Sequence, residues 1–253
     1  MRYRFRTSIA VVAFLAVVTA ACGSSATAPP VRHTRPTAPF RYVAVGGTDA
    51  TGNATDDPLL DAWPQQLFRG SMPLSAVFVN AAVPQETAAG ATVDQVSTAL
   101  TASPTVVTVW LVSGDLLAGT PPAVYATELR TLLAALRNGG RTTVLVGNSP
   151  PPAQMPGIVA CQAGSHQRRL SCPAPVPDEA SLDATVSAYN TAIAADAADV
   201  GAVVVDLHAA FSQAAAAGGP SVLDPTGADL STAGSTLVAR TFGAALSRTR
   251  SPG

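Results

Sequence analysis

The stretch from Val43 to Gly52, VAVGGTDATG, places a short apolar run directly before a turn of small and polar residues. The run from Tyr42 to Val45 is apolar without interruption, which predicts a strand buried on both faces, as in a parallel sheet. Four similar runs follow along the chain: Ala76 to Asn80, Val106 to Leu111, Thr143 to Gly147 and Ala202 to Asp206. Because helical patterns separate them, the sequence predicts an α/β fold of three layers, a doubly wound sheet of about five parallel strands covered by helices.

The segments between the predicted strands carry the periodicity of amphipathic helices. One helix presents a single apolar stripe and stops at residues 138–140, NGG; the stripe consists of Tyr125, Leu129, Leu132, Leu133 and Leu136. A second helix is predicted from about Asp178 to Asp199. A third begins near Ser231, which we expect as its N-cap, and turns three side chains inward: Leu237, Val238 and Phe242.

The N-terminus has the features of an export signal. Arg2, Arg4 and Arg6 precede an apolar run from Ile9 to Val18, which is shorter than the roughly 20 residues that a membrane-spanning helix needs. We therefore predict a signal peptide over residues 1–21. The following segment 19–22, TAAC, resembles the lipobox of bacterial lipoproteins, in which the cysteine is lipidated, although Thr19 replaces the usual leucine.

The predicted location follows from this signal. Cys22 would anchor the exported protein to the outer face of the bacterial cytoplasmic membrane, with an ordinary cleaved signal and a secreted protein as the alternative. Residues 22–40, which include His33, are expected to form a lipidated cysteine and a disordered tether rich in Ser, Thr and Pro. The folded domain is then expected over residues 41–247, with a disordered tail over 248–253.

The composition excludes several classes of function. Charged residues make up 12% of the chain and its formal net charge is −1, which argues against nucleic acid as a partner. All fifteen basic residues are arginines, so the chain has no lysine for a Schiff base or a phosphate-binding loop.

Cys161 and Cys172 share one polar loop, and in an oxidising compartment we expect them to form a disulfide. Metal binding is the weaker alternative, because His166 is the only further soft ligand nearby and zinc needs four.

The residues that follow the predicted strands resemble, in order and spacing, the blocks of the SGNH (GDSL) hydrolases, a family of esterases and lipases. The resemblance covers Arg41 to Leu246 and implies a flavodoxin-like SGNH hydrolase fold. The blocks that carry it are residues 43–52 (VAVGGTDATG), 80–84 (NAAVP), 109–117 (VWLVSGDLL), 147–151 (GNSPP), 205–208 (VDLH) and 229–234 (DLSTAG).

The resemblance also implies where the family's catalytic groups would stand. In the family a serine attacks the ester, a histidine three residues after an aspartate takes its proton, and a glycine N–H and an asparagine side chain form the oxyanion hole. All five positions are substituted here: the serine by Thr48, the glycine by Ala82, the asparagine by Gly114, the aspartate by Thr226 and the histidine by Asp229. No histidine follows His208, which we expect to pack or to cap a helix.

The acidic residues near the strand ends leave alternatives open. Asp229 is a poor base for an alcohol at its ordinary pKa of about 3.9, and it could instead cap the last helix together with Ser231. Asp49, Asp115 and Asp229 could converge on one cleft and bind a cation. The plainer interpretation is that Asp115 caps the turn after the third strand and that Asp49 caps the helix after the first.

The sequence therefore supports two hypotheses of different class. The first is an SGNH-like lipoprotein that has lost hydrolysis and acts as a binding or scaffold domain. The second is a carboxylic ester hydrolase with Thr48 as the nucleophile. A wall-assembly component without a small ligand is a third possibility. We expect no cofactor and no metal, and as partners the membrane through the lipid and an acyl ester or a cell-envelope ligand, with the oligomeric state left open.

Overall fold

The computed structural model describes residues 39–164, 171–173 and 176–250. The predicted signal peptide, Cys22 and His33 lie outside the described residues, as does His166 in the cysteine loop. Everything described belongs to one of the two units into which the chain divides, Ala38–Gly253. None of the helices in the described part of the chain is long and apolar enough to cross a membrane.

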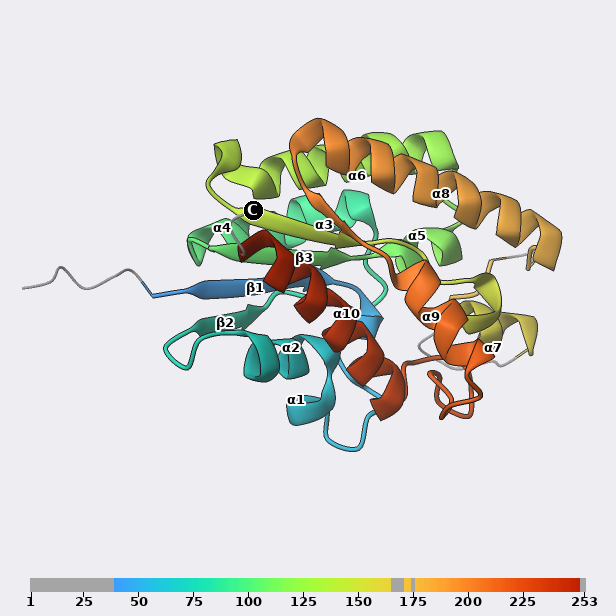
Figure 1. Cartoon of the computed structure of the whole chain (residues 1–253). Helices are drawn as coiled ribbons and strands as arrows, with labels where there is room; N and C mark the ends of the chain where they lie inside the picture. Colours follow the sequence, from blue (N-terminus) through green and yellow to red (C-terminus); the bar gives the residue numbers. More distant parts are fainter. Residues whose placement is uncertain (1–38, 165–170, 174–175, 251–253) are drawn as a thin grey trace, which may run out of the picture. The chain divides into compact units, whose positions relative to one another are not determined.

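Five parallel strands form one sheet in the order β2-β1-β3-β4-β5 (Figure 1), which confirms the predicted fold class. The strands are β1 (Arg41–Gly46), β2 (Val77–Asn80), β3 (Val106–Trp110), β4 (Thr143–Gly147) and β5 (Val203–Val205). Burial on both faces holds for β3 and nearly all of β1. It is wrong for β2, which lies at the edge of the sheet and leaves Val77 and Asn80 exposed. It is also wrong for β5 at the opposite edge, where Val203 and Val204 are only partly buried.

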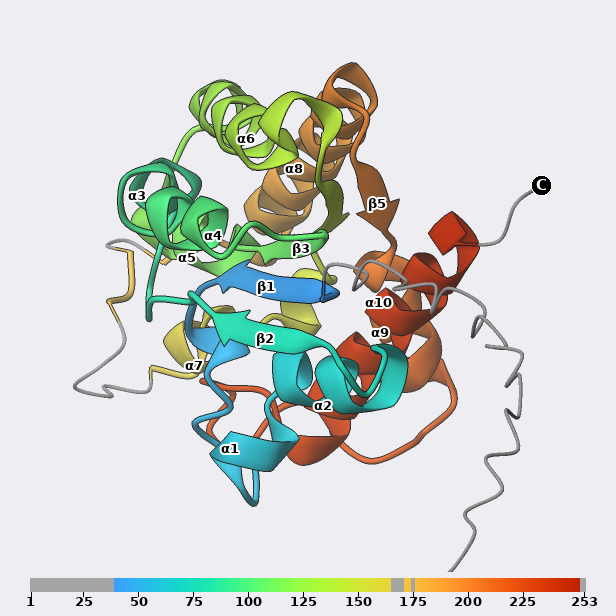
Figure 2. The same cartoon turned by 90° about the vertical axis from the view of Figure 1, so that its left-hand side faces the viewer.

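Helices cover both faces of the sheet (Figure 2). On one face lie α3, α4, α6 and α8, and on the other α2, α9 and α10. The ten helices of the described residues are α1 (Pro58–Asp61), α2 (Trp63–Ser71), α3 (Ala88–Asp94), α4 (Val96–Thr101), α5 (Val112–Ala118), α6 (Pro122–Arg137), α7 (Ile158–Gln162), α8 (Glu179–Val200), α9 (Leu207–Ala216) and α10 (Thr232–Arg250). Short 3-10 turns occupy Thr48–Ala50, Asn138–Gly140 and Pro152–Gln154.

Aromatic pairs join the helices on each side. The whole predicted stripe of α6 is buried, and Tyr125 stacks on Tyr189 of α8 with ring centroids 4.0 Å apart. On the opposite face Trp63 of α2 stacks on Phe242 of α10 at 4.9 Å. These pairs fix the helices against the sheet, since stacked aromatic rings contribute beyond the area that they bury.

The last helix begins as predicted and ends later than predicted. Ser231 accepts a hydrogen bond from the Gly234 N–H at 3.1 Å, the geometry of an N-cap. Val238 is fully buried, whereas Leu237 is only partly buried. The expected disordered tail is corrected for residues 248–250, because α10 continues through Arg250.

The two cysteines of the domain form a disulfide. Cys161 in α7 is bonded to Cys172, and their Cα atoms are 5.5 Å apart. The bond closes the polar loop between α7 and α8, as predicted from the sequence.

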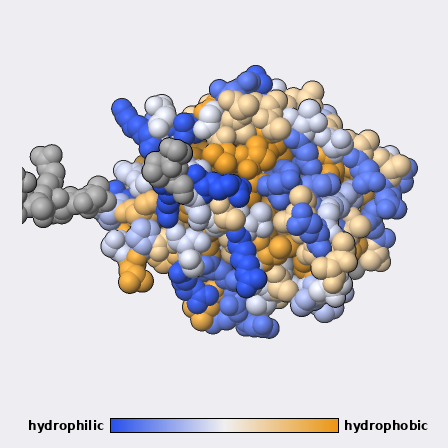
Figure 3. Space-filling model, viewed as in Figure 1, coloured by the Kyte–Doolittle hydropathy of each residue, from blue (hydrophilic) through white to orange (hydrophobic). Residues whose placement is uncertain are grey.

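The face of the molecule shown in Figure 3 mixes hydrophobic and hydrophilic residues. Several apolar side chains stand in solvent, among them Leu59 in α1 and Leu74 in the turn between α2 and β2, which are 80% and 108% exposed. Such exposure accords with a chain in which charged residues are scarce.

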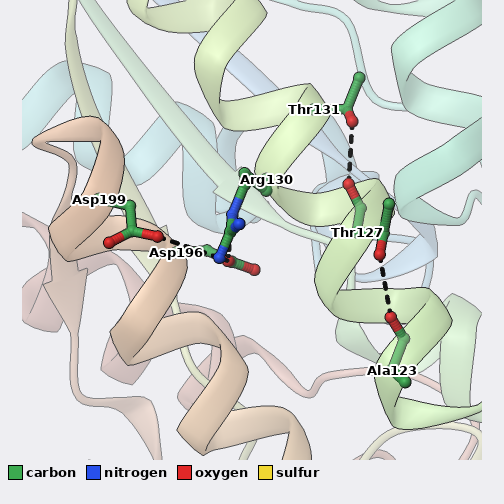
Figure 4. A network of polar contacts seen from close by, with 6 residues as sticks. All are labelled: Ala123, Thr127, Arg130, Thr131, Asp196 and Asp199. Atoms are coloured by element: carbon green, nitrogen blue, oxygen red, sulfur yellow. Dashed lines mark hydrogen bonds and ion pairs between the residues drawn. The ribbon is translucent and has the colours of Figure 1, made fainter.

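An arginine of α6 bridges two carboxylates of α8 (Figure 4). The Arg130 guanidinium lies 2.9 Å from Asp196 and 3.0 Å from Asp199. The Asp196 side chain is only 1% exposed, whereas that of Asp199 is 59% exposed. The pairing with Asp196 therefore compensates a buried charge, and the pairing with Asp199 is a surface contact.

Replacing Arg130 by Met should lower the free energy of unfolding by about 2 to 3 kcal/mol, because it leaves the buried Asp196 carboxylate unpaired. Asp199→Asn is the matched control and should cost less than about 1 kcal/mol. Urea denaturation of both variants measures the difference. Equal losses would show that the burial of Asp196 does not decide the strength of this contact.

Candidate functional site

A cavity of about 250 Å³ opens at the carboxyl ends of the strands. Its walls come from segments that follow β1, β2, β3 and β4 and from the loop before α10. The polar lining residues are Thr48, Asp49, Asn53, Gln85, Ser113 and Asp229, and Gly114, Leu117, Pro156, Gly157 and Ala228 complete it. Ligands of open α/β sheets bind at this end, which makes the cavity the candidate site.

Three of the five positions that the resemblance singles out line this cavity: Thr48, Gly114 and Asp229. Ala82 does not, and its N–H donates to Asn80 Oδ1 at 3.1 Å. Thr226 does not either. It is exposed, and its hydroxyl donates to Asp224 Oδ2 at 2.6 Å. Of the two positions that match the family's aspartate and histidine, only Asp229 lines the cavity.

The Thr48 hydroxyl is held by the loop after β2. The Gln85 N–H donates to Thr48 Oγ1 at 2.9 Å, and Gln85 has a φ of 61°, a left-handed conformation that is uncommon for a residue other than glycine. In this contact the Thr48 oxygen is the acceptor, so its own hydroxyl hydrogen stays available for a second bond. A backbone N–H therefore donates to the residue that matches the family's nucleophile.

The same loop packs directly on Gly114. A Cβ atom built at Gly114 would lie 1.9 Å from the Glu86 carbonyl oxygen. Real Cβ atoms do not approach an oxygen so closely, so any side chain at residue 114 requires the loop to move. Glycine is required here by the close approach of another backbone, and the family's asparagine does not fit in this arrangement.

Asp49 is a buried carboxyl at the cavity wall. It is 5% exposed, and the Ser113 hydroxyl donates to its Oδ2 at 2.5 Å. Burial raises the pKa of Asp49 to about 7; the hydrogen bond from Ser113 opposes the shift, and the negative charge of Asp229 adds to it. The prediction that Asp49 caps a helix is wrong, because its carboxyl bonds to a hydroxyl from another strand end.

Asp115 is fully buried and is not among the residues that line the cavity. Its Oδ2 accepts the N–H of Ala88, the first residue of α3, at 2.8 Å, and burial raises its pKa to about 6. It therefore holds a neighbouring helix and does not cap the turn after β3. Asp49 and Asp229 share the cavity without Asp115, and the described residues contain no group of three or more His, Cys, Asp or Glu that could hold a metal. The hypothesis of a three-carboxylate cation site is wrong.

Asp224 organises the loop that carries Asp229. Its Oδ1 accepts the N–H groups of Ala228 and Asp229, at 3.0 and 3.1 Å, while Oδ2 binds Thr226. Burial alone would raise the pKa of Asp224, but these hydrogen bonds lower it below its ordinary value. Asp229 consequently faces the cavity instead of capping α10.

His208 lies away from the cavity. Its backbone N–H donates to Asn148 Oδ1 at 2.8 Å, and its ring Nδ1 is 3.0 Å from the Ser149 carbonyl oxygen. This confirms that His208 packs at the start of α9. Of the described residues that line the cavity, none is a histidine.

Sequence reasoning missed several lining residues, among them Asn53, Gln85 and Ser113. Asn53 and Gln85 stand outside the strands in segments with no periodicity, and only their neighbours in space give them a role. Ser113 stands one residue before Gly114 and could have been found as the hydroxyl nearest to a substituted position. Asp224 had a local signal, because the sequence 224–227, DPTG, is typical of a turn.

The fold and the cavity define a hydrolase-type α/β domain, and comparisons with known proteins give its family. Residues 43–234 match the model of the GDSL-like lipase/acylhydrolase family, so the chain belongs to that family. The comparison with curated proteins found no match.

Solved structures with the same fold include three bacterial proteins. A member of the lipolytic G-D-S-L family from Veillonella parvula has a TM-score of 0.61 at 14% identity, with 83% of this chain and 99% of that chain covered. The lipase/acylhydrolase from Enterococcus faecalis has a TM-score of 0.61 at 14% identity, with 85% and 98% covered. An acetylxylan esterase from Geobacillus stearothermophilus, solved as a catalytic mutant, has a TM-score of 0.57 at 15% identity, with 80% and 92% covered. At this identity the likeness concerns the fold.

The raised pKa of Asp49 predicts a pH dependence of stability. Between its ordinary value of 3.8 and about 7 the folded protein binds more protons at Asp49 than the unfolded chain does, so the free energy of unfolding falls as the pH rises through this window. The loss should amount to a few kcal/mol, at about 1.4 kcal/mol for each unit of pKa shift. Asp115, with its pKa raised to about 6, contributes in the same direction.

Urea denaturation across this window measures the effect. Asp49→Asn should flatten the profile, whereas the exposed control Asp183→Asn should leave it unchanged. A wild-type profile that rises with pH, or one that Asp49→Asn does not alter, would contradict the assignment.

Proposed function

We propose that this protein is an extracytoplasmic lipoprotein whose SGNH-type domain binds a ligand in the cavity and does not hydrolyse it. The observation that carries the proposal is the Glu86 carbonyl packed on Gly114. An oxyanion hole needs hydrogen-bond donors aimed at the developing negative charge. At this position the chain presents an acceptor, and it leaves no room for the amide side chain that the family's hydrolases use.

The nucleophile position supports the same conclusion. Thr48 is the residue that matches the family's serine, and a carboxyl, Asp229, stands at the position that matches the histidine. Loss of the general base costs about 10⁶ in kcat in a serine protease, which corresponds to roughly 8 kcal/mol. Loss of one oxyanion donor costs about 3 kcal/mol. The two effects are not additive, but either one alone makes hydrolysis marginal.

The lining indicates what kind of group the cavity accepts. Two carboxyls, two hydroxyls and two side-chain amides face a volume of about 250 Å³, and no described lining residue is basic. Carboxylates disfavour an anionic group and accept hydrogen bonds from a neutral polar group. An acyl ester or a cell-envelope component with hydroxyl or amide groups fits these requirements, and the lipid anchor on Cys22 would hold the domain beside such material.

The second candidate is a carboxylic ester hydrolase with Thr48 as the nucleophile. It is favoured by Asp49, because a carboxyl with a pKa of about 7 at the cavity wall matches the requirement for a general base near neutral pH. Against it stands the hydrogen bond of that carboxyl to Ser113 rather than to Thr48.

We predict no measurable turnover of p-nitrophenyl acetate or butyrate and no labelling by a fluorophosphonate, because such probes react well only with an activated hydroxyl. Thr48→Ala is the matched variant and should behave like the wild type in both assays. Hydrolysis or labelling that Thr48→Ala abolishes would establish the second candidate instead.

The anchoring is tested separately. The N-terminal peptide of the exported protein should begin at Cys22 and carry the mass of a lipid, and the protein should partition into detergent. Cys22→Ala should remove the lipid mass, whereas Ser24→Ala should retain it. Mass spectrometry of the peptide decides. An unmodified Cys22 in the exported protein would rule out the lipoprotein.

A further inference from the structure

The amino ends of the strands form one end of the domain, which we call the basic end. It comprises the described residues 39–41, 70–77, 100–105, 137–142, 199–202 and 247–250. The parallel register places these segments together, since Arg41 pairs with Val77 and Tyr42 with Val106. Five arginines lie here: Arg41, Arg137, Arg141, Arg248 and Arg250. Within these ranges the only acidic residue is Asp199, whose carboxylate pairs with Arg130.

The opposite end has the reverse charge. The described segments that follow the strands contain no arginine; they are residues 47–57, 81–87, 111–121, 148–164, 206 and 217–231. Arg168 and Arg169 lie outside the described residues. The described segments contain the acidic residues Asp49, Asp56, Asp57, Glu86, Asp115, Asp206, Asp224 and Asp229. Among the described residues, positive charge therefore lies at the amino ends of the strands and negative charge at their carboxyl ends, where the candidate cavity is.

Hydrogen bonds hold part of the basic end in place and leave part of it available. Arg137 donates to the Val200 carbonyl at 3.0 Å, and the Arg250 guanidinium lies 4.5 Å from the centre of the Phe40 ring while donating to the Ser71 carbonyl. Arg141 and Arg248 are exposed. The fully exposed Leu74 and the half-exposed Val77 of β2 lie at the same end.

The N-terminal segment joins the domain at this end. Pro39 and Phe40 directly precede β1, and Figure 1 shows β1 beginning at the same end of the sheet at which α10 finishes. Sixteen residues, 23–38, separate Cys22 from Pro39. Fully extended they span at most about 55 Å, so a lipid on Cys22 keeps the domain near the bilayer.

We propose that the basic end is a docking surface for an anionic lipid bilayer, an inference that rests on the proposed anchoring through Cys22. Arginines near an anionic leaflet are attracted to its headgroups over about a Debye length. An exposed leucine beside them can enter the boundary between headgroups and acyl chains. The domain would then stand on the membrane with its cavity facing away, open to material outside.

The test uses the mature chain from residue 22 onward with Cys22→Ala, so that no lipid contributes. Its binding to vesicles of phosphatidylcholine mixed with phosphatidylglycerol is compared with binding to phosphatidylcholine alone by co-sedimentation. We expect binding to the mixed vesicles only, and a decrease as salt rises. Arg141→Gln combined with Arg248→Gln should lower the partition coefficient about tenfold at low salt, because each arginine near such a surface contributes several-fold.

Two further variants test the contribution of arginine position and the contribution of the exposed leucine. Arg240→Gln is the matched control, because this arginine is exposed on the same helix as Arg248 and Arg250. It lies about 15 Å before Arg250 along the helix, at 1.5 Å per residue. This substitution should change binding less than twofold. Leu74→Ser should lower the binding that persists at high salt. Circular dichroism confirms that each variant is folded.

Equal binding to both vesicle types would overturn the proposal, and so would an equal effect of Arg240→Gln and the double variant. Binding of a soluble polyanion such as polyphosphate, without binding to vesicles, would assign the basic end to a different partner. Because this chain carries no lipid, its result is independent of whether Cys22 is lipidated in the cell.

Discussion

The close packing of the Glu86 carbonyl on Gly114 is the constraint on which the candidate site depends. The loop after β2 reaches across to the start of α5, and its backbone fits only because residue 114 has no Cβ. The same loop brings the Gln85 N–H to the Thr48 hydroxyl. One backbone segment therefore fills the place of an oxyanion-hole side chain and engages the hydroxyl that stands in the nucleophile position. The fold of the family is kept, while glycine and aspartate occupy residues 114 and 229, the positions that match the family's asparagine and histidine.

Burial then determines the electrostatics of the cavity. Asp49 has been withdrawn from solvent and bonded to Ser113, and together with Asp229 it gives the cavity a carboxyl-rich wall. Five arginines of the described residues lie at the basic end, at the other end of the strands. The proposed membrane docking uses the basic end and the proposed ligand binding uses the cavity, so the two proposals do not compete for one surface.

Much of the fold could be predicted from the sequence, because buried parallel strands and amphipathic helices leave strong patterns. The predicted strands agree with the observed ones to within one residue at either end, and the stripe of α6 is buried as predicted. The edge position of β2 could not be predicted, since an apolar run does not reveal strand order. Less of the candidate site than of the fold could be predicted from the sequence. The bond between Asp49 and Ser113 joins residues 64 positions apart, and the need for glycine at residue 114 comes from a loop 28 positions earlier.

In the proposed function the cavity binds its ligand without forming a covalent acyl intermediate. Intact-mass measurement after incubation with an excess of an activated ester, quenched in acid, tests this directly. We expect an unchanged mass for the wild type. A mass increase equal to one acyl group, located on Thr48 by peptide mapping and absent in Thr48→Ala, would contradict it.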